Sequence, residues 1–264
     1  PHAAFLTLAS VLMVQALFFA DGGLLALGAN VFNMAFIPCY LVYPLLYRRW
    51  IGGSMNGWRY RVVTLTAVLV AVQLGALGVV LETTFSGIAE LSFAAFALLM
   101  QPIHLVIGAV EGLITLAVVT FLHRADPSLA QLSVAGVAPS RKPVLIGLTA
   151  AALAIGGCLS WFAAADPDGL EWSIARLSGD AELAVPATPV HRAAEALQQQ
   201  LAVMPDYVSR HTVEPAPSVP AAWGTPNADT TLAGILGGGA TLLLVSLIGW
   251  ALRRRGGGDA AAQG

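Results

Sequence analysis

Charged residues are scarce in this sequence. They make up 11% of the 264 residues, whereas hydrophobic residues make up 57%. A soluble domain of this length normally carries about 25% charged residues. The mean hydropathy of +0.74 agrees with this deficit. The composition therefore predicts an all-α, polytopic helical membrane protein in contact with the lipid bilayer.

Other features that are missing exclude whole classes of chemistry. A net charge of −2 supplies no basic surface, so we expect no nucleic-acid partner. The two cysteines, Cys39 and Cys158, lie in separate hydrophobic runs without metal or redox spacing, and we expect buried, inert thiols. No HExxH, CxxC, P-loop or GxSxG motif is present. We therefore do not expect an enzyme, and any active transport must draw its energy from another chain.

Hydrophobic runs of membrane-spanning length are abundant. A transmembrane helix needs about 20 apolar residues. Six candidates follow one another along the chain, at 3–20, 24–47, 62–82, 88–122, 143–165 and 231–252. The fourth is too long for one span, and we expect Pro102 to divide it into a short re-entrant or interfacial piece, 88–99, and a full helix, 102–122.

The basic residues give these spans a direction. Ten of the thirteen lie in three clusters, which are Arg48, Arg49, Arg59 and Arg61; Arg124, Arg141 and Lys142; and Arg253, Arg254 and Arg255. The positive-inside rule places all three in the cytoplasm, together with the C-terminus. Six crossings satisfy this arrangement, and they leave the turns at 21–30 and 82–90 and the segment 166–230 outside.

Segment 166–230 differs in kind from the rest of the chain. It contains eight of the fifteen prolines and nine of the fifteen acidic residues, with only three arginines. We expect a loosely structured extracytoplasmic loop, with a short helix near 190–203 and an extended run at 215–226. The chain then divides into a membrane core (1–123), a cytoplasmic linker (124–142), a helix–loop–helix module (143–252) and a cytoplasmic tail (253–264).

Two ionisable side chains lie inside one expected span. His104 and Glu111 are seven residues apart, which places them on the same helix face but about 10 Å apart along the axis. That separation is too large for both to ligate one ion. Gly108 and Gly112 would let a neighbouring helix approach this face. His104 would then belong to an outward-facing site with Glu111 orienting a partner group, or the two would simply form interhelical hydrogen bonds.

The stretch from Ala20 to Met34 places polar groups beside an apolar run. Asn30 and Asn33 lie near one face at the start of the second span, where their carboxamides would hold an inserted loop or a ligand, or satisfy unwound backbone. Asp21 is a candidate cap for that start. We expect unusual backbone dihedrals at Gly22, Gly23 and Gly28. In the last span, Gly234 and Gly238 form a GxxxG step, which favours helix contact.

Two longer stretches resemble a known family. The segments VQALFFADGGLLALGANVFNM (Val14–Met34) and HLVIGAVEGLIT (His104–Thr115) are similar to the CbiM/NikM family, the substrate-capture subunits of cobalt and nickel energy-coupling-factor transporters. DPDGLE (Asp166–Glu171) and MPDY (Met204–Tyr207) resemble the PDGLE module, which is CbiN/NikN-like. The first resemblance covers roughly 1–125, and the second covers the remaining helix–loop–helix module.

The resemblance implies a permease component in a bacterial or archaeal cytoplasmic membrane. It would capture Ni²⁺ or Co²⁺ as the transported ion, hold no permanent cofactor, and work with a transmembrane coupling subunit and cytoplasmic ATPase subunits. Asn30, Asn33, His104 and Glu111 match family positions around the site and are transferred as supporting residues. Pro167, Asp168, Gly169, Leu170 and Glu171 form the module motif.

The sequence departs from the family pattern at the principal ligands. In the family these come from a Met-His start and a GTSGH-type segment, and this chain contains neither. We therefore expect the principal ligands to lie outside this chain, and the chain to begin inside the family core. A structural or assembly membrane protein without metal capture is the alternative. An intramembrane enzyme would need His104 and Glu111 closer together and a nucleophile beside them.

Overall fold

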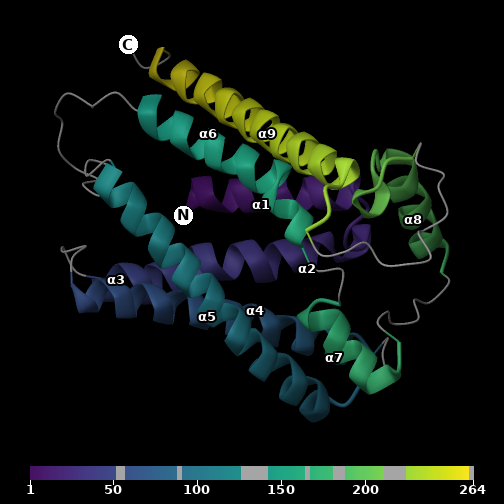
Figure 1. Ribbon diagram of the computed structural model, residues 1–264. Helices are drawn as coiled ribbons and strands as arrows, with labels where there is room; N and C mark the ends of the chain where they lie inside the picture. Colours follow the sequence, from purple (N-terminus) through teal and green to yellow (C-terminus); the bar gives the residue numbers. More distant parts are fainter. Residues whose placement is uncertain are drawn as a thin grey trace. The chain divides into compact units, whose positions relative to one another are not determined.

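The computed structural model describes residues 1–51, 57–87, 91–125, 142–163, 167–180, 188–210 and 224–261. These residues form helices and connecting turns, with no strand among them (Figure 1). In chain order the helices are α1 (His2–Phe18), η1 (Leu24–Ala26), α2 (Leu27–Val31), η2 (Phe32–Tyr47), α3 (Arg48–Ile51), α4 (Trp58–Ser86), α5 (Phe93–Ala125), α6 (Lys142–Gly157), η4 (Leu159–Phe162), α7 (Gly169–Ser178), α8 (Pro189–Leu201), η5 (Pro205–Tyr207) and α9 (Ala228–Ala261). Here η2 is a π-helix and the other η elements are 3₁₀ turns.

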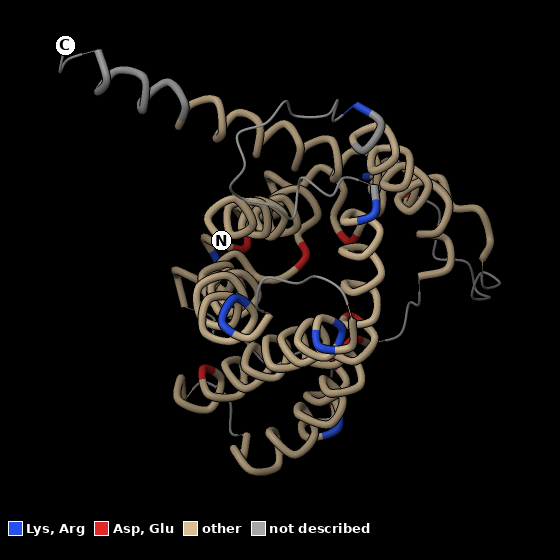
Figure 2. The backbone as a smooth tube through the Cα atoms, turned by 90° about the vertical axis from the view of Figure 1, so that its left-hand side faces the viewer, with Lys and Arg blue, Asp and Glu red and all other residues tan. Residues whose placement is uncertain are grey.

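Four helical segments are long and apolar enough to cross a membrane. They are Leu24–Ile51, Trp58–Ser86, Phe93–Arg124 and Ala228–Leu252, while His2–Phe18 and Leu145–Gly157 are shorter apolar helices. Figure 2 shows how few charged residues these helices carry along their lengths. The chain is a multi-pass membrane protein. The described residues of the six predicted runs are mainly helical, but only four of these helical segments reach membrane-spanning length.

The predicted division at Pro102 is wrong. α5 runs without interruption from Phe93 to Ala125 and includes Pro102 in its interior. A proline removes one backbone hydrogen bond, but a helix in lipid tolerates this where neighbouring groups satisfy the freed carbonyl. Leaving the helix would expose several backbone groups instead of one. The separate piece expected at 88–99 is therefore the first turns of α5, apart from residues 88–90, which lie outside the described residues.

The segment 166–230 is more ordered than predicted. Its described residues include α7, so the expectation of a loosely structured loop is wrong for Gly169–Ser178. α8 confirms the short helix expected near 190–203. α7 begins where side-chain caps satisfy the first backbone N–H groups, as shown below. Asp166 and most of the run 215–226 lie outside the described residues.

The ends of the predicted segments also differ. α9 continues beyond the predicted end at 252 to Ala261, so the described part of the expected tail is helical. Adding a residue to an existing helix costs far less than starting one, so helices often outlast their apolar window. Most of the linker expected at 124–142 lies outside the described residues.

The chain folds into two compact units. The first contains Gly28–Thr149 and Ala165–His191, together with Pro1. In it η2 and α5 pack against α4, and α7 packs against α5. The main core lies between α4, α5 and α7. It consists of Ala76 and Val80 from α4, Phe96 and Met100 from α5, and Ile174 from α7. A smaller core between η2 and α4 consists of Ile37, Val42 and Ala67.

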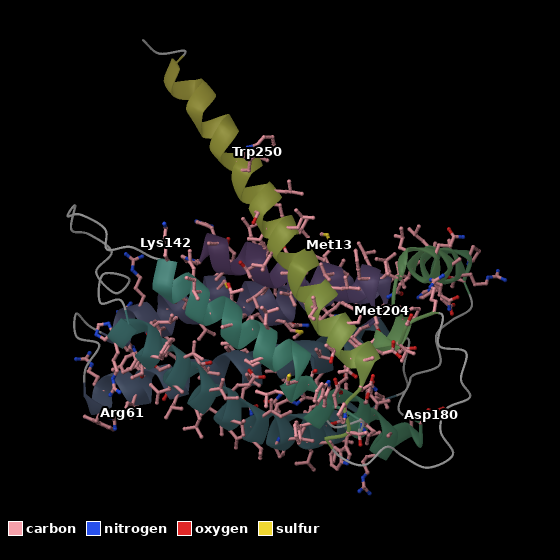
Figure 3. All side chains as sticks on the ribbon, turned by 45° about the horizontal axis from the view of Figure 1, so that its top comes forward. Met13, Arg61, Lys142, Asp180, Met204 and Trp250 are labelled. Carbon is pink, nitrogen blue, oxygen red and sulfur yellow. The ribbon has the colours of Figure 1, made fainter. Side chains whose placement is uncertain are left out.

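The second unit contains His2–Leu27, Ala150–Ala164 and Arg192–Gly264. Its core is formed by Val14 and Phe19 at the end of α1, Met204 (Figure 3) and Ala233 of α9. Each unit therefore takes elements from both ends of the chain. α1 packs with late elements, and α7 packs with early ones. In each unit, the core combines residues from the first half of the chain with residues from the second half.

Candidate functional site

Asn33 is the most buried of the predicted site residues. It lies in the first turn of η2 with 3% of its surface exposed. Its Nδ2 donates a hydrogen bond of 2.8 Å to Oε2 of Glu82, near the end of α4. The sequence places these residues 49 positions apart, and no local pattern links them. The pair therefore links the beginning of the membrane-spanning segment Leu24–Ile51 to the end of α4.

Two glycines of α4 make room for Asn33. A Cβ at Gly78 would lie 2.1 Å from Oδ1 of Asn33, and a Cβ at Gly75 would lie 3.1 Å from its backbone oxygen. The Oδ1 atom is buried and accepts no hydrogen bond from the described residues. The carboxamide is thus held between the Glu82 carboxylate and the backbone of α4 at Gly75 and Gly78, where no side chain intervenes. This geometry fixes its orientation.

The other polar groups of the stretch from Ala20 behave differently. Asn30 is half-buried, and its carboxamide makes no hydrogen bond to another described residue. Asp21 does not cap the second span, because the 3₁₀ turn η1 begins after Gly23 without a side-chain cap. Of the three glycines, only Gly22 adopts a left-handed backbone, with φ 71°, while Gly23 has φ −63°. The prediction of unusual dihedrals is confirmed for Gly22 only.

His104 lies on α5 and is half-buried. Its Nδ1 lies 2.8 Å from the backbone oxygen of Met100. A carbonyl oxygen only accepts, so Nδ1 carries the proton and the neutral ring has its lone pair on Nε2. On the other side of the ring is Gly169, where a Cβ would lie 3.1 Å from Cε1 of His104. The imidazole is therefore held between its own helix and the first residue of α7.

The module motif explains why α7 begins at that point. Asp168 is the N-cap residue, and its Oδ1 accepts hydrogen bonds of 2.8 Å from the backbone N–H groups of Leu170 and Glu171. The Glu171 carboxylate in turn accepts from the backbone N–H of Asp168, at 3.2 Å. This reciprocal capping box satisfies two donors that a bare helix end would leave unpaired. The D-x-x-E spacing is visible in the sequence and would have predicted α7.

Glu111 is separated from His104 in the structure. It is exposed on α5, whereas His104 is covered by α7. The predicted role for Gly108 and Gly112 is confirmed, because a Cβ at Gly108 would lie 3.3 Å from Leu69 and one at Gly112 would lie 3.1 Å from Leu65. These glycines let α4 approach α5.

Within the described residues, no hydrogen bond joins any two of Asn30, Asn33, His104 and Glu111. The described residues as a whole contain no group of three histidine, cysteine or acidic side chains that could hold a metal ion. Of the two thiols, Cys39 is buried but Cys158 is exposed, so the expectation for Cys158 is wrong. The site region thus consists of two separate polar contacts, Asn33 with Glu82 and His104 with the backbone of Met100, both in the first unit.

Comparison with known proteins decides what these contacts belong to. Residues 1–129 match the model of the CbiM family, described as a cobalt uptake substrate-specific transmembrane region. Residues 142–254 match the PDGLE domain. The chain is a fusion of a CbiM region and a PDGLE domain. His104, Asn33 and Glu82 lie in the CbiM region, and α7 opens with the sequence that gives the PDGLE domain its name.

Several curated transport proteins are similar to this chain. A NikMN protein of Archaeoglobus fulgidus is 35% identical over 134 residues, which cover 49% of this chain and 42% of the relative. The fused nickel transport protein NikMN of Rhodobacter capsulatus is 33% identical over 160 residues, covering 53% and 44%. The cobalt transport protein CbiM of Sorangium cellulosum is 32% identical over 136 residues, covering 48% and 57%. The chain spans about half the length of these curated relatives. No solved structure matches it significantly.

In the second unit, the PDGLE domain holds the end of α1 of the CbiM region. Gln198 of α8 is 7% exposed, and its Nε2 donates to the backbone oxygens of Ala16 (3.0 Å) and Gly22 (2.7 Å). Its Oε1 accepts from the backbone N–H of Leu24 at 3.3 Å. One carboxamide thus satisfies three backbone groups where the chain leaves α1. Sequence reasoning missed Gln198 because a single glutamine among three in a row carries no signal.

The MPDY segment of the PDGLE domain completes this contact. Backbone N–H groups of Val203 and Met204 donate to the oxygen of Phe18, which the end of α1 leaves without a helical partner. The Tyr207 hydroxyl donates to the Asp21 carboxylate, and its ring stacks on Phe19 at 4.7 Å. Burial, followed by the hydrogen bond to Asp21, raises the pKa of Tyr207 to about 12. The hydroxyl therefore keeps its proton at neutral pH and can donate.

Gln198→Ala is expected to loosen the turn after α1. Three backbone groups would lose their partner, and each buried unsatisfied group costs about 1–3 kcal/mol. Hydrogen exchange of the Leu24 amide should become faster, because its acceptor is removed. Gln200→Ala removes a neighbouring exposed carboxamide and serves as the matched control. Equal exchange rates in the two variants would contradict this role of Gln198.

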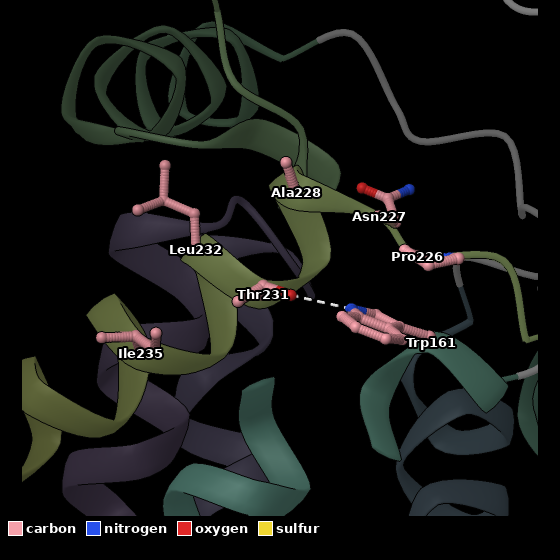
Figure 4. Close-up of a pocket in the computed structure, with 7 residues that line it drawn as sticks. All are labelled: Trp161, Pro226, Asn227, Ala228, Thr231, Leu232 and Ile235. Carbon is pink, nitrogen blue, oxygen red and sulfur yellow. Dashed lines mark hydrogen bonds between the residues drawn. The ribbon is translucent and has the colours of Figure 1, made fainter. Parts of the chain in front are cut away.

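The PDGLE domain also contains a close crossing of α6 and α9. A Cβ at Gly234 would lie 2.5 Å from the backbone oxygen of Gly156, whereas nothing lies within 4 Å of a Cβ at Gly238. The GxxxG prediction is therefore confirmed for Gly234 but not for Gly238. Beside the crossing, Trp161 donates to the Thr231 hydroxyl at 2.7 Å, and Thr231 donates to the oxygen of Gly157 at 2.8 Å (Figure 4). Trp161 and Thr231 border a shallow, mainly apolar pocket of about 460 Å³.

Proposed function

We propose that this chain is part of the substrate-capture permease of an energy-coupling-factor transporter for Co²⁺ or Ni²⁺ uptake. The observation that supports it is the order of the two matched regions, a cobalt-uptake transmembrane region followed by a PDGLE domain. A relative in Rhodobacter capsulatus is named as a fused nickel transport protein, NikMN. The metal ion is the transported substrate, so the chain needs no resident metal.

The residues of this chain act as supporting groups in the proposal. The principal ligands are nitrogen atoms supplied from outside residues 1–264, in an arrangement that suits Ni²⁺ with Co²⁺ as competitor. Asn33, held by Glu82, braces the segment that faces those ligands. His104 offers an imidazole nitrogen nearby, and Asn30 and Glu111 complete the set of supporting side chains.

The energy for transport comes from other chains. We propose a transmembrane coupling subunit and cytoplasmic ATPase subunits as partners, because the sequence contains no nucleotide-binding motif. We propose from the positive-inside rule that the loops with the three basic clusters, and the C-terminus, lie in the cytoplasm. This topology requires the shorter apolar helix Leu145–Gly157 to cross the membrane as well. The segment 166–230 then lies on the outer side, where the ion arrives.

Uptake by cells tests the proposal. The complete gene that encodes this chain is deleted and then restored together with its coupling and ATPase subunits, and cell-associated Ni²⁺ and Co²⁺ are measured at submicromolar supply. We expect restored accumulation of at least one of the two ions, and a lower level with His104→Gln. If the restored strain accumulates no more of either ion than the deletion strain, the proposal is wrong.

A structural or assembly role without metal capture is the second candidate. The observation that favours it is the packing of α7 and the 198–207 segment into cores formed by other parts of the chain. The same uptake experiment separates the two candidates. Loss of a structural protein would lower the amount of transporter in the membrane. In a capture subunit, by contrast, His104→Gln lowers uptake while the amount of transporter in the membrane stays the same.

A further inference from the structure

Each residue of the PDGLE motif that the structure describes has a definable contact. Asp168 and Glu171 close the capping box that starts α7. Leu170 packs against the core of the first unit, next to the buried Ile174. Pro167 precedes the cap and is exposed. Only Gly169 remains to be explained, since its backbone is not left-handed and its position in a helix would suit alanine better.

Clearance for His104 explains Gly169. A Cβ at this position would lie 3.1 Å from Cε1 and 3.5 Å from Nε2 of the imidazole, and 3.1 Å from Cδ1 of Ile107. Contacts of 3.1 Å are tighter than nine in ten real Cβ contacts, so the ring or Ile107 would have to move by a few tenths of an ångström. The glycine therefore lets the start of α7 lie close to Cε1 and Nε2 of the imidazole.

The Nδ1 atom of the ring is held by Met100. Its backbone oxygen accepts the hydrogen bond from Nδ1 of His104, and its side chain, 1% exposed, packs in the same core as Ile174 of α7. α7 thus holds both the ring and the residue that binds the ring. No described residue donates a hydrogen bond to Nε2. The only lone pair of the neutral imidazole is left for a group that is not part of the described chain.

We infer that the PDGLE motif is a positioning device for His104. It docks the N-terminal end of α7 on the imidazole, holds the proton on Nδ1, and leaves the Nε2 lone pair to bind a divalent transition-metal ion. The inference rests on the proposed function for the identity of the ion. His104 would touch the ion, whereas Asp168, Gly169 and Glu171 act only through His104. Groups that orient a metal-binding histidine typically change metal affinity by about 10–100-fold when they are mutated.

The proton position can be measured without any transport. The complete protein is labelled with ¹⁵N-histidine and studied by NMR in detergent without metal, and His104 is assigned by the signal that is lost in His104→Gln. We expect the Nδ1–H pattern in the wild type. In Gly169→Ala we expect a shift towards the Nε2–H pattern, because the displaced ring loses its bond to Met100. Gly147→Ala is the matched control, since nothing lies within 4 Å of a Cβ there.

A second variant keeps the test independent of folding at position 169. Asp168→Ala removes the cap without adding volume, and it should also mix the two tautomers. The circular dichroism and size-exclusion profile of each variant are compared with those of the wild type before labelling. An Nε2–H wild type, or Nδ1–H signals unchanged in both variants, would overturn the inference.

Uptake gives the functional readout. In Gly169→Ala the metal concentration for half-maximal uptake should rise about tenfold, while the maximal rate stays close to that of Gly147→Ala. A fall in maximal rate alone would indicate a structural role and contradict positioning. The NMR and uptake measurements also test the proposed function and the positioning of His104 separately. If the wild type transports neither ion, the proposed function fails while the tautomer result stands, and if transport is normal but the tautomer is insensitive to α7, only this inference fails.

Discussion

Gly78→Ala is expected to be among the most damaging single substitutions in the CbiM region. The new Cβ would lie 2.1 Å from Oδ1 of Asn33, and the carboxamide cannot turn away without losing its hydrogen bond to Glu82. Overpacking of this kind costs about 1–3 kcal/mol, which outweighs the gain of about 1 kcal/mol from replacing a helical glycine with alanine. The midpoint of thermal unfolding in detergent should fall by several degrees.

A second substitution tests the cause directly. Asn33→Ala removes Oδ1, so the double variant Asn33→Ala with Gly78→Ala should be more stable than the two single changes predict together. Gly75→Ala is the matched control, because a Cβ there would meet the backbone oxygen of Asn33, at 3.1 Å, which alanine retains. Asn33→Ala should therefore rescue position 78 but not position 75. Additive effects at position 78 would show that the Asn33 carboxamide does not occupy the space beside Gly78.

Gly234→Ala should separate α6 from α9 in the PDGLE domain. Here the Cβ would lie 2.5 Å from the oxygen and 2.9 Å from the Cα of Gly156. These are backbone atoms, so no side-chain rotation can relieve the contact. Moving the helices apart would also break the bonds from Thr231 to Gly157 and from Trp161 to Thr231. We expect a loss of stability of about 2 kcal/mol or more from overpacking and two broken hydrogen bonds.

Gly238 offers a control one helical turn further along α9. It is the same residue type in the same helix, but a Cβ there meets nothing within 4 Å. Gly238→Ala should therefore be neutral or slightly stabilising. The comparison is made by thermal unfolding and by the fluorescence of Trp161, with Trp161→Phe identifying its contribution. If Gly234→Ala and Gly238→Ala unfold at the same temperature, the close crossing of α6 and α9 is wrong.

The helical class and the location of the helices could be predicted from hydrophobic run length. That signal is local and strong, because lipid forces each spanning segment to satisfy its own backbone. The prediction was wrong at Pro102, where the rule for soluble helices was applied to an apolar helix that tolerates proline. It also missed α7, since a ten-residue helix in a proline-rich segment has no long apolar run. The capping pair Asp168 and Glu171 was the available signal.

The contacts of the site could be predicted only in part. Asn33 and His104 were selected as polar groups in apolar surroundings, and both make specific contacts in the structure. Their partners were not predictable, because Glu82 and Gly169 come from distant parts of the sequence and one sequence contains no information on pairing. Gln198 was missed for the same reason. A buried carboxamide is identified by what surrounds it, and those neighbours are 174 to 182 residues away along the chain.

Metal retention by the complete polypeptide that contains this chain tests the central claim most directly. The purified protein in detergent is dialysed to equilibrium against Ni²⁺ or Co²⁺, with Zn²⁺ and Mg²⁺ as comparison ions, and the protein-bound metal is determined. The account predicts saturable retention of about one Ni²⁺ or Co²⁺ per chain, in preference to Mg²⁺ because nitrogen donors favour transition metals. It also predicts weaker retention in His104→Gln. Absence of Ni²⁺ and Co²⁺ retention by a folded protein would contradict it.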